Sequence, residues 1–251
     1  MKLFKSLIKK SVEKLGYKIV RITPSSREDI PVGNKEIGME ACIRGLYSRG
    51  FYPKMLIDIG AARGDWTRIA LKYWANSTYF LIEPLQEFES NLRNLKRQYI
   101  NTDYILAAAG PKKEKRKLGI TEDLFGSSLL YAGAFSREVP VITIDGLLEE
   151  ERIEQPDFMK IDVQGFELFV LQGAIKAMKR CTLILLELQF FRFRTNTKLL
   201  HESMAWMVDH GFIPYEIVDV LRRPLDGAMG QCDVLFCKFD NPLLTDTRWG
   251  S

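Results

Sequence analysis

The chain of 251 residues is 46% hydrophobic and 27% charged, and its formal net charge is +4. This length and composition suit one large α/β domain or two small ones, and no run of about 18 uncharged apolar residues predicts a membrane-spanning helix. The four cysteines form no C-x-x-C pair, which indicates reduced thiols in a cytoplasmic protein rather than a disulfide framework.

The positive charge is concentrated at the N-terminus. Residues 1–22 contain seven Lys or Arg and one Glu, which gives +6, so residues 23–251 carry −2. A protein that follows a phosphate backbone usually has a basic main domain. We therefore expect no nucleic-acid partner.

Residues 1–22 are predicted to form a basic amphipathic helix. Apolar side chains recur at helical spacing from Leu3 to Leu15, and lysines occupy the other face and interrupt the apolar run that a signal peptide would need. Two interpretations stay open: the helix packs on the main domain, or it lies on an anionic membrane surface. The turn-rich residues 23–34 are predicted to be a linker, which leaves 35–251 as the main domain.

From residue 35 onward, segments with helical periodicity alternate with short, almost continuously apolar segments. The predicted strands are 55–60, 78–84, 102–110, 156–163 and 181–188. The predicted helices are 35–49, 66–73, 86–98, 167–178 and 198–210. A basic stretch and a polar loop are expected between the third and fourth strands, and a final antiparallel pair over 213–220 and 232–239. This order predicts a doubly wound α/β fold, with a parallel sheet covered on both faces.

The first strand runs into a glycine-containing turn, LIDIGAARGDW at residues 56–66. In an open α/β sheet, ligands bind outside the carboxyl ends of the strands. Gly60 permits a tight turn there, and Gly64 permits a close approach of the backbone to a ligand. A dinucleotide site needs G-x-G-x-x-G and a phosphate loop needs G-K-[ST], and both are absent. The turn therefore argues against a dehydrogenase.

Two acids narrow the identity of the ligand. Asp58 would repel a phosphate and would instead help to hold a positively charged amino group. Glu83, at the end of the second strand, is placed to accept hydrogen bonds from two ribose hydroxyls. A ligand with a ribose, an amino group and no phosphate is S-adenosylmethionine. The residues expected to bind this cofactor are Asp58, Gly60, Ala61, Gly64, Glu83 and Ala107.

The sequence resembles FkbM-type S-adenosylmethionine-dependent methyltransferases in the order and spacing of seven motifs: DIGAARGDWT, LIEP, AAAG, GSS, TIDGLL, DFMKIDVQGFELFVLQGA and LLELQ. The resemblance covers roughly residues 54–239, and its most specific part is KIDVQGFE…LQGA. It implies a Rossmann-like class I methyltransferase fold, with a seven-stranded, mostly parallel sheet and an antiparallel last strand. It also implies O-methylation of a sugar, a glycan or a related hydroxylated metabolite.

The sequence departs from the family pattern at two positions. Ala62 stands where the family usually has asparagine, and Gln164 stands where it usually has glutamate. Gln164 keeps hydrogen-bonding capacity but loses a charge, so it is expected to bind substrate rather than to act as a base or a metal ligand.

Catalytic groups are expected at the ends of the fourth and fifth strands. Asp162 is the first candidate for orienting or deprotonating the acceptor hydroxyl, and its alternative role is to cap the next helix. Glu187 is a second acid at the same edge of the sheet. Ser127 and Ser128 are candidates for binding substrate hydroxyls, with ordinary loop solvation as the alternative. No compact cluster of metal ligands is visible, so no metal is expected.

Two other functions are compatible with parts of the sequence. A non-catalytic S-adenosylmethionine-binding or membrane-surface module is the main alternative, and the joint presence of the glycines and acids argues against it. A nucleic-acid methyltransferase is disfavoured because no N-P-P-[YFW]-like motif follows the fourth strand. The expected partner is a small-molecule or glycan acceptor, with peripheral contact to an anionic membrane through residues 1–22 left open.

Overall fold

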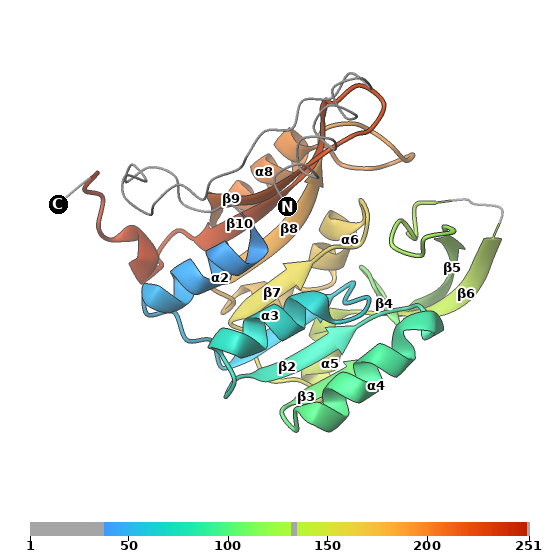
Figure 1. Cartoon of the computed structure of the whole chain (residues 1–251), viewed down its shortest axis with the longest axis horizontal. Helices are drawn as coiled ribbons and strands as arrows, with labels where there is room; N and C mark the ends of the chain where they lie inside the picture. The colour runs from blue at the N-terminus through green and yellow to red at the C-terminus, as the bar shows by residue number, and fades with distance from the viewer. Residues whose placement is uncertain (1–37, 132–134, 250–251) are drawn as a thin grey trace, which may run out of the picture. The chain divides into compact units, whose positions relative to one another are not determined.

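In the computed structural model of the protein, residues 38–131 and 135–249 are described (Figure 1). The chain divides into two compact units, Met1–Glu36 and Ile37–Ser251, and the described residues belong to the second. The N-terminal helix predicted over 1–22 lies outside the described residues and stays a prediction. Within the described part of the chain, no helix is long and apolar enough to cross a membrane.

Seven strands form the central sheet (Figure 1), in the order β3-β2-β1-β7-β8-β10-β9. They are β1 (Met55–Ile59), β2 (Thr78–Ile82), β3 (Thr102–Ile105), β7 (Phe158–Ile161), β8 (Leu183–Gln189), β9 (Phe212–Arg222) and β10 (Met229–Lys238). The pairs from β3 across to β8 are parallel, whereas β10 is antiparallel to both β8 and β9. The prediction of a seven-stranded, mostly parallel sheet with a reversed last strand is confirmed.

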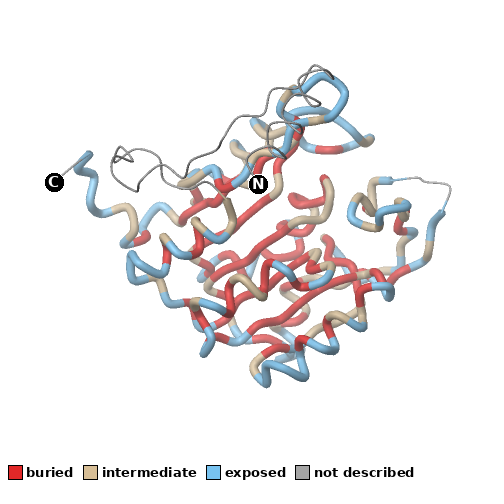
Figure 2. The backbone as a smooth tube through the Cα atoms, in the orientation of Figure 1, coloured by how far each residue is buried: buried red, intermediate tan, exposed pale blue. Residues whose placement is uncertain are grey.

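Helices cover both faces of this sheet. One face carries α2 (Met39–Ser48), α3 (Asp65–Tyr73) and α4 (Glu89–Gln98), and the other carries α5 (Ile144–Glu149), α6 (Glu167–Gln172), α7 (Ile175–Met178) and α8 (Leu200–Asp209). Neighbouring strand residues point to opposite faces, so Leu56 packs in one core cluster and Ile57 in the other. Figure 2 shows the strands as the most buried part of the unit. The doubly wound arrangement is confirmed.

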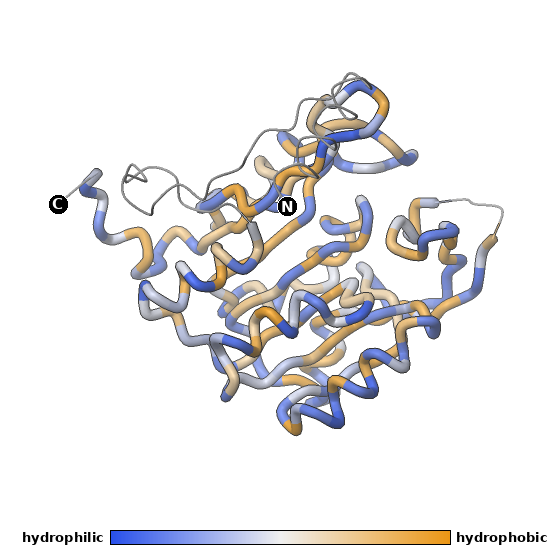
Figure 3. The backbone as a smooth tube through the Cα atoms, in the orientation of Figure 1, coloured by the Kyte–Doolittle hydropathy of each residue, from blue (hydrophilic) through white to orange (hydrophobic). Residues whose placement is uncertain are grey.

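The helices contribute one apolar side each to these two clusters. In α4, for example, only Leu92 and Leu95 are buried in a sequence that is otherwise polar or charged. Figure 3 shows the resulting contrast between hydrophobic strands and the largely hydrophilic α4. Each helix buries one side against the sheet, and the sheet is apolar on both faces. This burial determines the arrangement of helices on both sides of the sheet.

A second, three-stranded sheet stands beside the central one, which the sequence analysis did not predict. It contains β4 (Ala108–Ala109), β5 (Glu114–Ile120) and β6 (Phe135–Ile142), in the order β4-β6-β5. The prediction of one strand over 102–110 is wrong, because the chain leaves the central sheet after Ile105 and pairs Ala108 and Ala109 with β6. The first four residues of β5 are all charged and only Leu118 and Gly119 are buried, so this strand resembles a polar loop in composition.

The prediction of a single helix over 167–178 is also wrong. The chain forms two short helices, α6 and α7, separated at Gly173. Gly173 packs against the backbone of Gly110, where an added Cβ would lie 2.1 Å from the carbonyl oxygen. The carboxylate of Asp145 then accepts hydrogen bonds from the amides of Lys176 and Ala177, at 2.9 Å, and so caps α7.

Candidate active site

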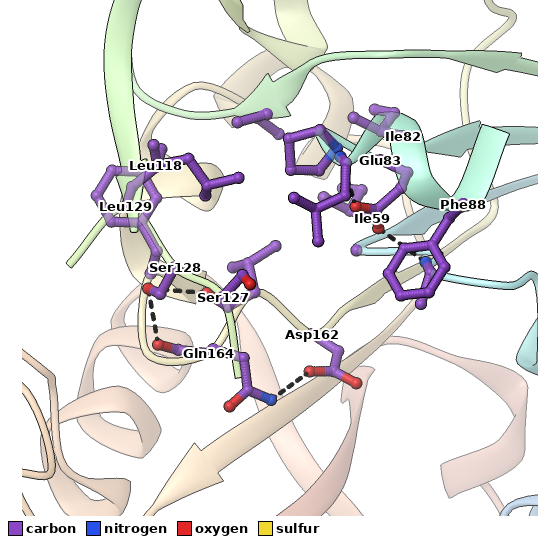
Figure 4. Close-up of a pocket in the computed structure, with 18 of the residues that line it drawn as sticks. Ile59, Ile82, Glu83, Phe88, Leu118, Ser127, Ser128, Leu129, Asp162 and Gln164 are labelled. Carbon is purple, nitrogen blue, oxygen red and sulfur yellow. Dashed lines mark hydrogen bonds between the residues drawn. The ribbon is translucent and has the colours of Figure 1, made fainter. Parts of the chain in front are cut away.

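A cavity lies at the carboxyl ends of β1, β2 and β7, where the strand order reverses (Figure 4). The space between its walls is about 740 Å³, including the part open to solvent. The turns after the three strands form one side, and the small sheet with the loop after β5 forms the other. The lining residues are Ile59, Gly60, Ala62, Ile82, Glu83, Pro84, Leu85, Phe88, Ala107, Ala108, Ala109, Leu118, Leu124, Phe125, Ser127, Ser128, Leu129, Asp162, Val163, Gln164 and Phe166.

The glycine turn after β1 is shaped by contacts within the protein. Gly60 has a φ of 73°, and an added Cβ would lie 1.8 Å from the carbonyl oxygen of Asp162. Gly64 has a φ of 77° and begins α3, and its Cβ would lie 3.2 Å from Leu95. Gly60 lines the cavity. Gly64 packs closely against Leu95 and lies outside the lining, and its expected role at the cofactor stays a prediction. Ala61, also expected at the cofactor, is 5% exposed and lies outside the lining.

Ala62 adopts an uncommon conformation in the same turn. Its φ is 46°, in the left-handed region that asparagine enters more readily than alanine. This geometry gives a physical reason for asparagine at this position of the family pattern. The Ala62 amide is directed at the carboxylate of Glu83.

Glu83 lies in the cavity wall at the end of β2, as expected for a ribose-binding acid. It is 4% exposed, and its carboxylate accepts hydrogen bonds from the amides of Ala62, at 2.8 Å, and Leu85, at 2.9 Å. Burial raises the pKa of Glu83 to about 7, although the two amides act in the opposite direction. Each carboxylate oxygen keeps a free lone pair, so the group can still accept bonds from a ligand. The predicted cofactor residue Ala107 lines the same cavity.

Asp58 lies in β1, and its contacts are within the protein. It is 1% exposed and does not line the cavity. Its carboxylate accepts a 2.8 Å hydrogen bond from the hydroxyl of Thr67 and lies 3.4 Å from Nζ of Lys160. Asp58 therefore anchors α3 and Lys160 to β1, and the expected contact between its carboxylate and a cofactor amino group stays a prediction.

Lys160, for which no role was predicted, connects the first turn to Asp162. Its Nζ donates to the Gly60 carbonyl at 3.0 Å and lies 3.4 Å from both Asp58 and Asp162. Burial opposes the charge of Lys160, but the two carboxylates outweigh it and raise the pKa of this amine. A lysine within the apolar strand FMKI was the signal that could have indicated this role.

Asp162, Gln164 and Glu187 are joined by one side-chain amide. Nε2 of Gln164 donates to Asp162 at 3.2 Å and to Glu187 at 2.9 Å (Figure 4 shows the first bond). Asp162 lines the cavity with its side chain 35% exposed, whereas Glu187 lies behind it and does not line the cavity. Burial, followed by the charges of Asp162 and Glu167, raises the pKa of Glu187. A neutral donor at position 164 thus separates two acids, where the usual glutamate would add a third.

The turn that carries Asp162 is fixed from several directions. The buried carboxylate of Glu167 accepts hydrogen bonds from the amides of Val163, at 3.1 Å, and Gly165, at 2.9 Å. The hydroxyl of Ser128 donates to the carbonyl of Gln164 at 3.0 Å. The catalytic candidate therefore stands on a rigid turn, which is the condition for accurate alignment with a second reactant.

The two serines differ in their availability to a substrate. Both line the cavity (Figure 4). Ser128 is 2% exposed, and its hydroxyl already donates to Gln164 and accepts from the Leu130 amide at 3.1 Å. The hydroxyl of Ser127 accepts one bond, from the Thr121 amide at 3.1 Å, and keeps its proton to donate. Ser127 is the better placed of the two for a substrate hydroxyl.

A further acidic residue, Asp233, lies on β10 next to this group of acids. Asp233 pairs in register with Glu187 of β8 and with Asp219 of β9. Burial, together with the charge of Asp162, raises the pKa of Asp233 to about 7, while Lys160 acts against the rise. Within the described residues, no group of three or more His, Cys, Asp or Glu side chains is placed to hold a metal ion.

The raised pKa of Asp233 predicts a pH-dependent stability. Between its ordinary pKa of 3.8 and about 7, the native state keeps a proton that the unfolded state has lost, so stability falls as the pH rises through this window. Asp233→Asn is expected to stabilise the protein by about 1–3 kcal/mol at pH 8 and to have little effect near pH 4. Urea unfolding at both pH values measures this difference. A gain that is equal at both would contradict the assignment.

The reversed seventh strand, the glycine turn after β1 and the buried acid at the end of β2 define an α/β methyltransferase of class I that uses S-adenosylmethionine. Residues 58–214 match the sequence profile described as Methyltransferase FkbM domain, and the chain belongs to this family. S-adenosylmethionine is the methyl donor of the family.

Solved methyltransferases with a similar chain course have low sequence identity to this protein. Precorrin-6y C5,15-methyltransferase from Geobacter metallireducens is 16% identical, with a TM-score of 0.44 over 79% of this chain and 87% of that one. N-methyltransferase NodS from Bradyrhizobium japonicum is 10% identical, with a TM-score of 0.47 over 79% and 93%. The 1,6-didemethyltoxoflavin-N1-methyltransferase from Burkholderia thailandensis, solved with S-adenosylhomocysteine, is 10% identical, with a TM-score of 0.46 over 80% and 78%. No curated protein matches the chain.

Proposed function

We propose that the protein transfers the methyl group of S-adenosylmethionine to a hydroxyl oxygen of a sugar, a glycan or a related small metabolite. The observation that carries this proposal is the position of Asp162, a partly exposed carboxylate in the same cavity as Glu83 (Figure 4). Glu83 would hold the ribose, and Asp162 lines the same cavity at the turn after β7.

Bound S-adenosylmethionine would supply an electrophilic methyl group, and its transfer to the acceptor oxygen would leave S-adenosylhomocysteine. The hydroxyl proton would pass to the carboxylate of Asp162. Lys160 and Gln164 hold this carboxylate through one contact on each oxygen, at 3.4 and 3.2 Å, which leaves a lone pair free for the proton. The contribution of the protein is mainly alignment together with proton acceptance.

The proposal is tested with S-adenosylmethionine labelled on its methyl group. The purified full chain is incubated with extracts of small glycans and hydroxylated metabolites, and products are detected by mass spectrometry. We expect a product that carries one labelled methyl group, which fragmentation places on oxygen. A label on nitrogen or carbon would contradict O-methylation. Tight cofactor binding with no labelled product in any extract would favour the non-catalytic module.

Glu83→Gln is expected to weaken binding of S-adenosylhomocysteine by about 1–3 kcal/mol, because charge-assisted hydrogen bonds to the ribose are lost. Since the pKa of Glu83 is about 7, wild-type affinity should rise as the pH increases from 6 to 8 and this acid ionises. The variant should lack this dependence. Calorimetry measures both effects.

A matched control is Glu87→Gln, because Glu87 pairs with Arg137 outside the cavity. This variant should bind S-adenosylhomocysteine as the wild type does. If Glu83→Gln has wild-type affinity and the wild-type response to pH, Glu83 does not hold the cofactor.

A further inference from the structure

A second cavity adjoins the first at Gln164, which lines both. It lies between the loop after β8 and the hairpin that joins β9 to β10, which run side by side in Figure 1. Arg194, Arg222 and Arg223 line it, and its lining contains no aspartate or glutamate. Positive side chains therefore line the second cavity, while the acids Asp162 and Glu187 lie on the other side of Gln164.

Two of the three arginines have no carboxylate partner within the described residues. Arg223 is neutralised by Asp226, through two hydrogen bonds to its carboxylate. Arg194 donates only to carbonyl oxygens, those of Gln164 at 3.2 Å and Gly126 at 2.7 Å. Arg222 donates to the carbonyl of Gly227 at 2.9 Å. Carbonyl groups leave the charge of a guanidinium uncompensated, so this cavity presents two positive charges.

A buried amide in the same wall also lacks partners. Gln189 is 1% exposed, and neither the nitrogen nor the oxygen of its side chain has a hydrogen-bond partner among the described residues. A buried polar group without a partner costs about 1–3 kcal/mol, so its presence in a cavity wall is typical of a site that a ligand completes.

We propose that the second cavity binds an anionic group of the methyl acceptor, either a phosphate or a carboxylate. The planar guanidinium groups of Arg194 and Arg222 suit the oxygens of both groups. Asp162 and Glu187, on the other side of Gln164, repel the anion, so the acceptor is oriented with its hydroxyl toward Asp162. This inference rests on the proposed function and narrows the acceptor to an acidic or phosphorylated hydroxyl compound.

The anion site is tested by chemical modification of arginine. The full chain, loaded with S-adenosylhomocysteine, is treated with phenylglyoxal in potassium chloride, potassium phosphate or potassium acetate of equal ionic strength. Peptide mass spectrometry gives the modification rate of each arginine. At an anion concentration about ten times Kd, the free site is reduced about tenfold. Arg222 and Arg194 should therefore react about tenfold more slowly in phosphate, in acetate or in both, and the protecting salt identifies the anion.

Arg192 is the matched internal control, because it lies in the same loop but pairs with Glu202 outside the cavity. Its rate should be equal in the three salts. In the variant Arg222→Gln, protection of Arg194 should largely disappear. Equal rates for Arg222 and Arg194 in all three salts, or equal protection of Arg192, would overturn the proposal.

Calorimetry with S-adenosylhomocysteine separates this test from that of the proposed function. Arg222 does not line the cofactor cavity, so Arg222→Gln should bind S-adenosylhomocysteine with wild-type affinity. Failure of the wild type to bind S-adenosylhomocysteine would reject the proposed function, whatever the modification rates show. Cofactor binding without anion protection would reject the anion site alone.

Discussion

Asparagine in place of Asp162 is expected to lower the rate of methyl transfer by about 10²–10⁴-fold, the usual contribution of a general base. An amide has the size of the carboxylate but cannot take up the hydroxyl proton. Because the Asp162 side chain is 35% exposed, the change should affect stability far less than turnover. Single-turnover transfer of labelled methyl to the acceptor that the wild type uses measures the rate, and urea unfolding measures the stability.

Asp219→Asn is the control for this variant, since Asp219 belongs to the same group of acids but lies exposed on β9. It removes one negative charge without changing the cavity lining, and its rate should stay close to that of the wild type. If Asp162→Asn transfers methyl at the wild-type rate, Asp162 has a structural role. Glu187 would then become the next candidate for the base.

Gly60→Ala is expected to destabilise the protein by about 3 kcal/mol or more. The left-handed conformation at φ 73° costs a residue with a Cβ about 1–2 kcal/mol. The new Cβ would also lie 1.8 Å from the Asp162 carbonyl, so the turns after β1 and β7 must move apart. The same movement separates the cofactor turn from the catalytic candidate, so methyl transfer should fall as well. Urea unfolding and the transfer assay measure the two effects.

Gly50→Ala distinguishes backbone strain from the close contact. Gly50 has a φ of 82°, similar to that of Gly60, but nothing lies within 4 Å of a Cβ built there. This variant should lose only about 1–2 kcal/mol from strain and should keep its activity. If Gly60→Ala is no less stable than Gly50→Ala, the contact between the two turns is not important for the site.

The central fold and part of the cavity followed from local patterns in the sequence. A parallel strand buried on both faces is apolar throughout, which is why β1, β7 and β8 were predictable from composition alone. Glu83 and Asp162 come directly after such strands, so their position at one edge of the sheet followed from the topology. The same reasoning placed Gly60 in the cavity wall.

The other features of the site depend on which strands and turns contact one another. Local sequence patterns do not contain this information. Asp58 and Lys160 face each other because β1 and β7 are paired in one particular register, although about 100 residues separate them along the chain. The break at Gly173 exists because Gly110 approaches it closely. The small sheet was missed because β4 has only two residues and β5 begins with four consecutive charged residues. Leu118, which lies in β5, therefore entered the cavity wall without a sequence signal.

The most direct test of the site is a crystal structure of the full chain with S-adenosylhomocysteine. We expect the ribose hydroxyls to lie about 3 Å from the carboxylate of Glu83, at hydrogen-bond distance, and the sulfur atom to face the side of the cavity that carries Asp162. A ligand bound with its ribose away from Glu83, or with its sulfur directed away from Asp162, would contradict the assignment of this cavity as the active site.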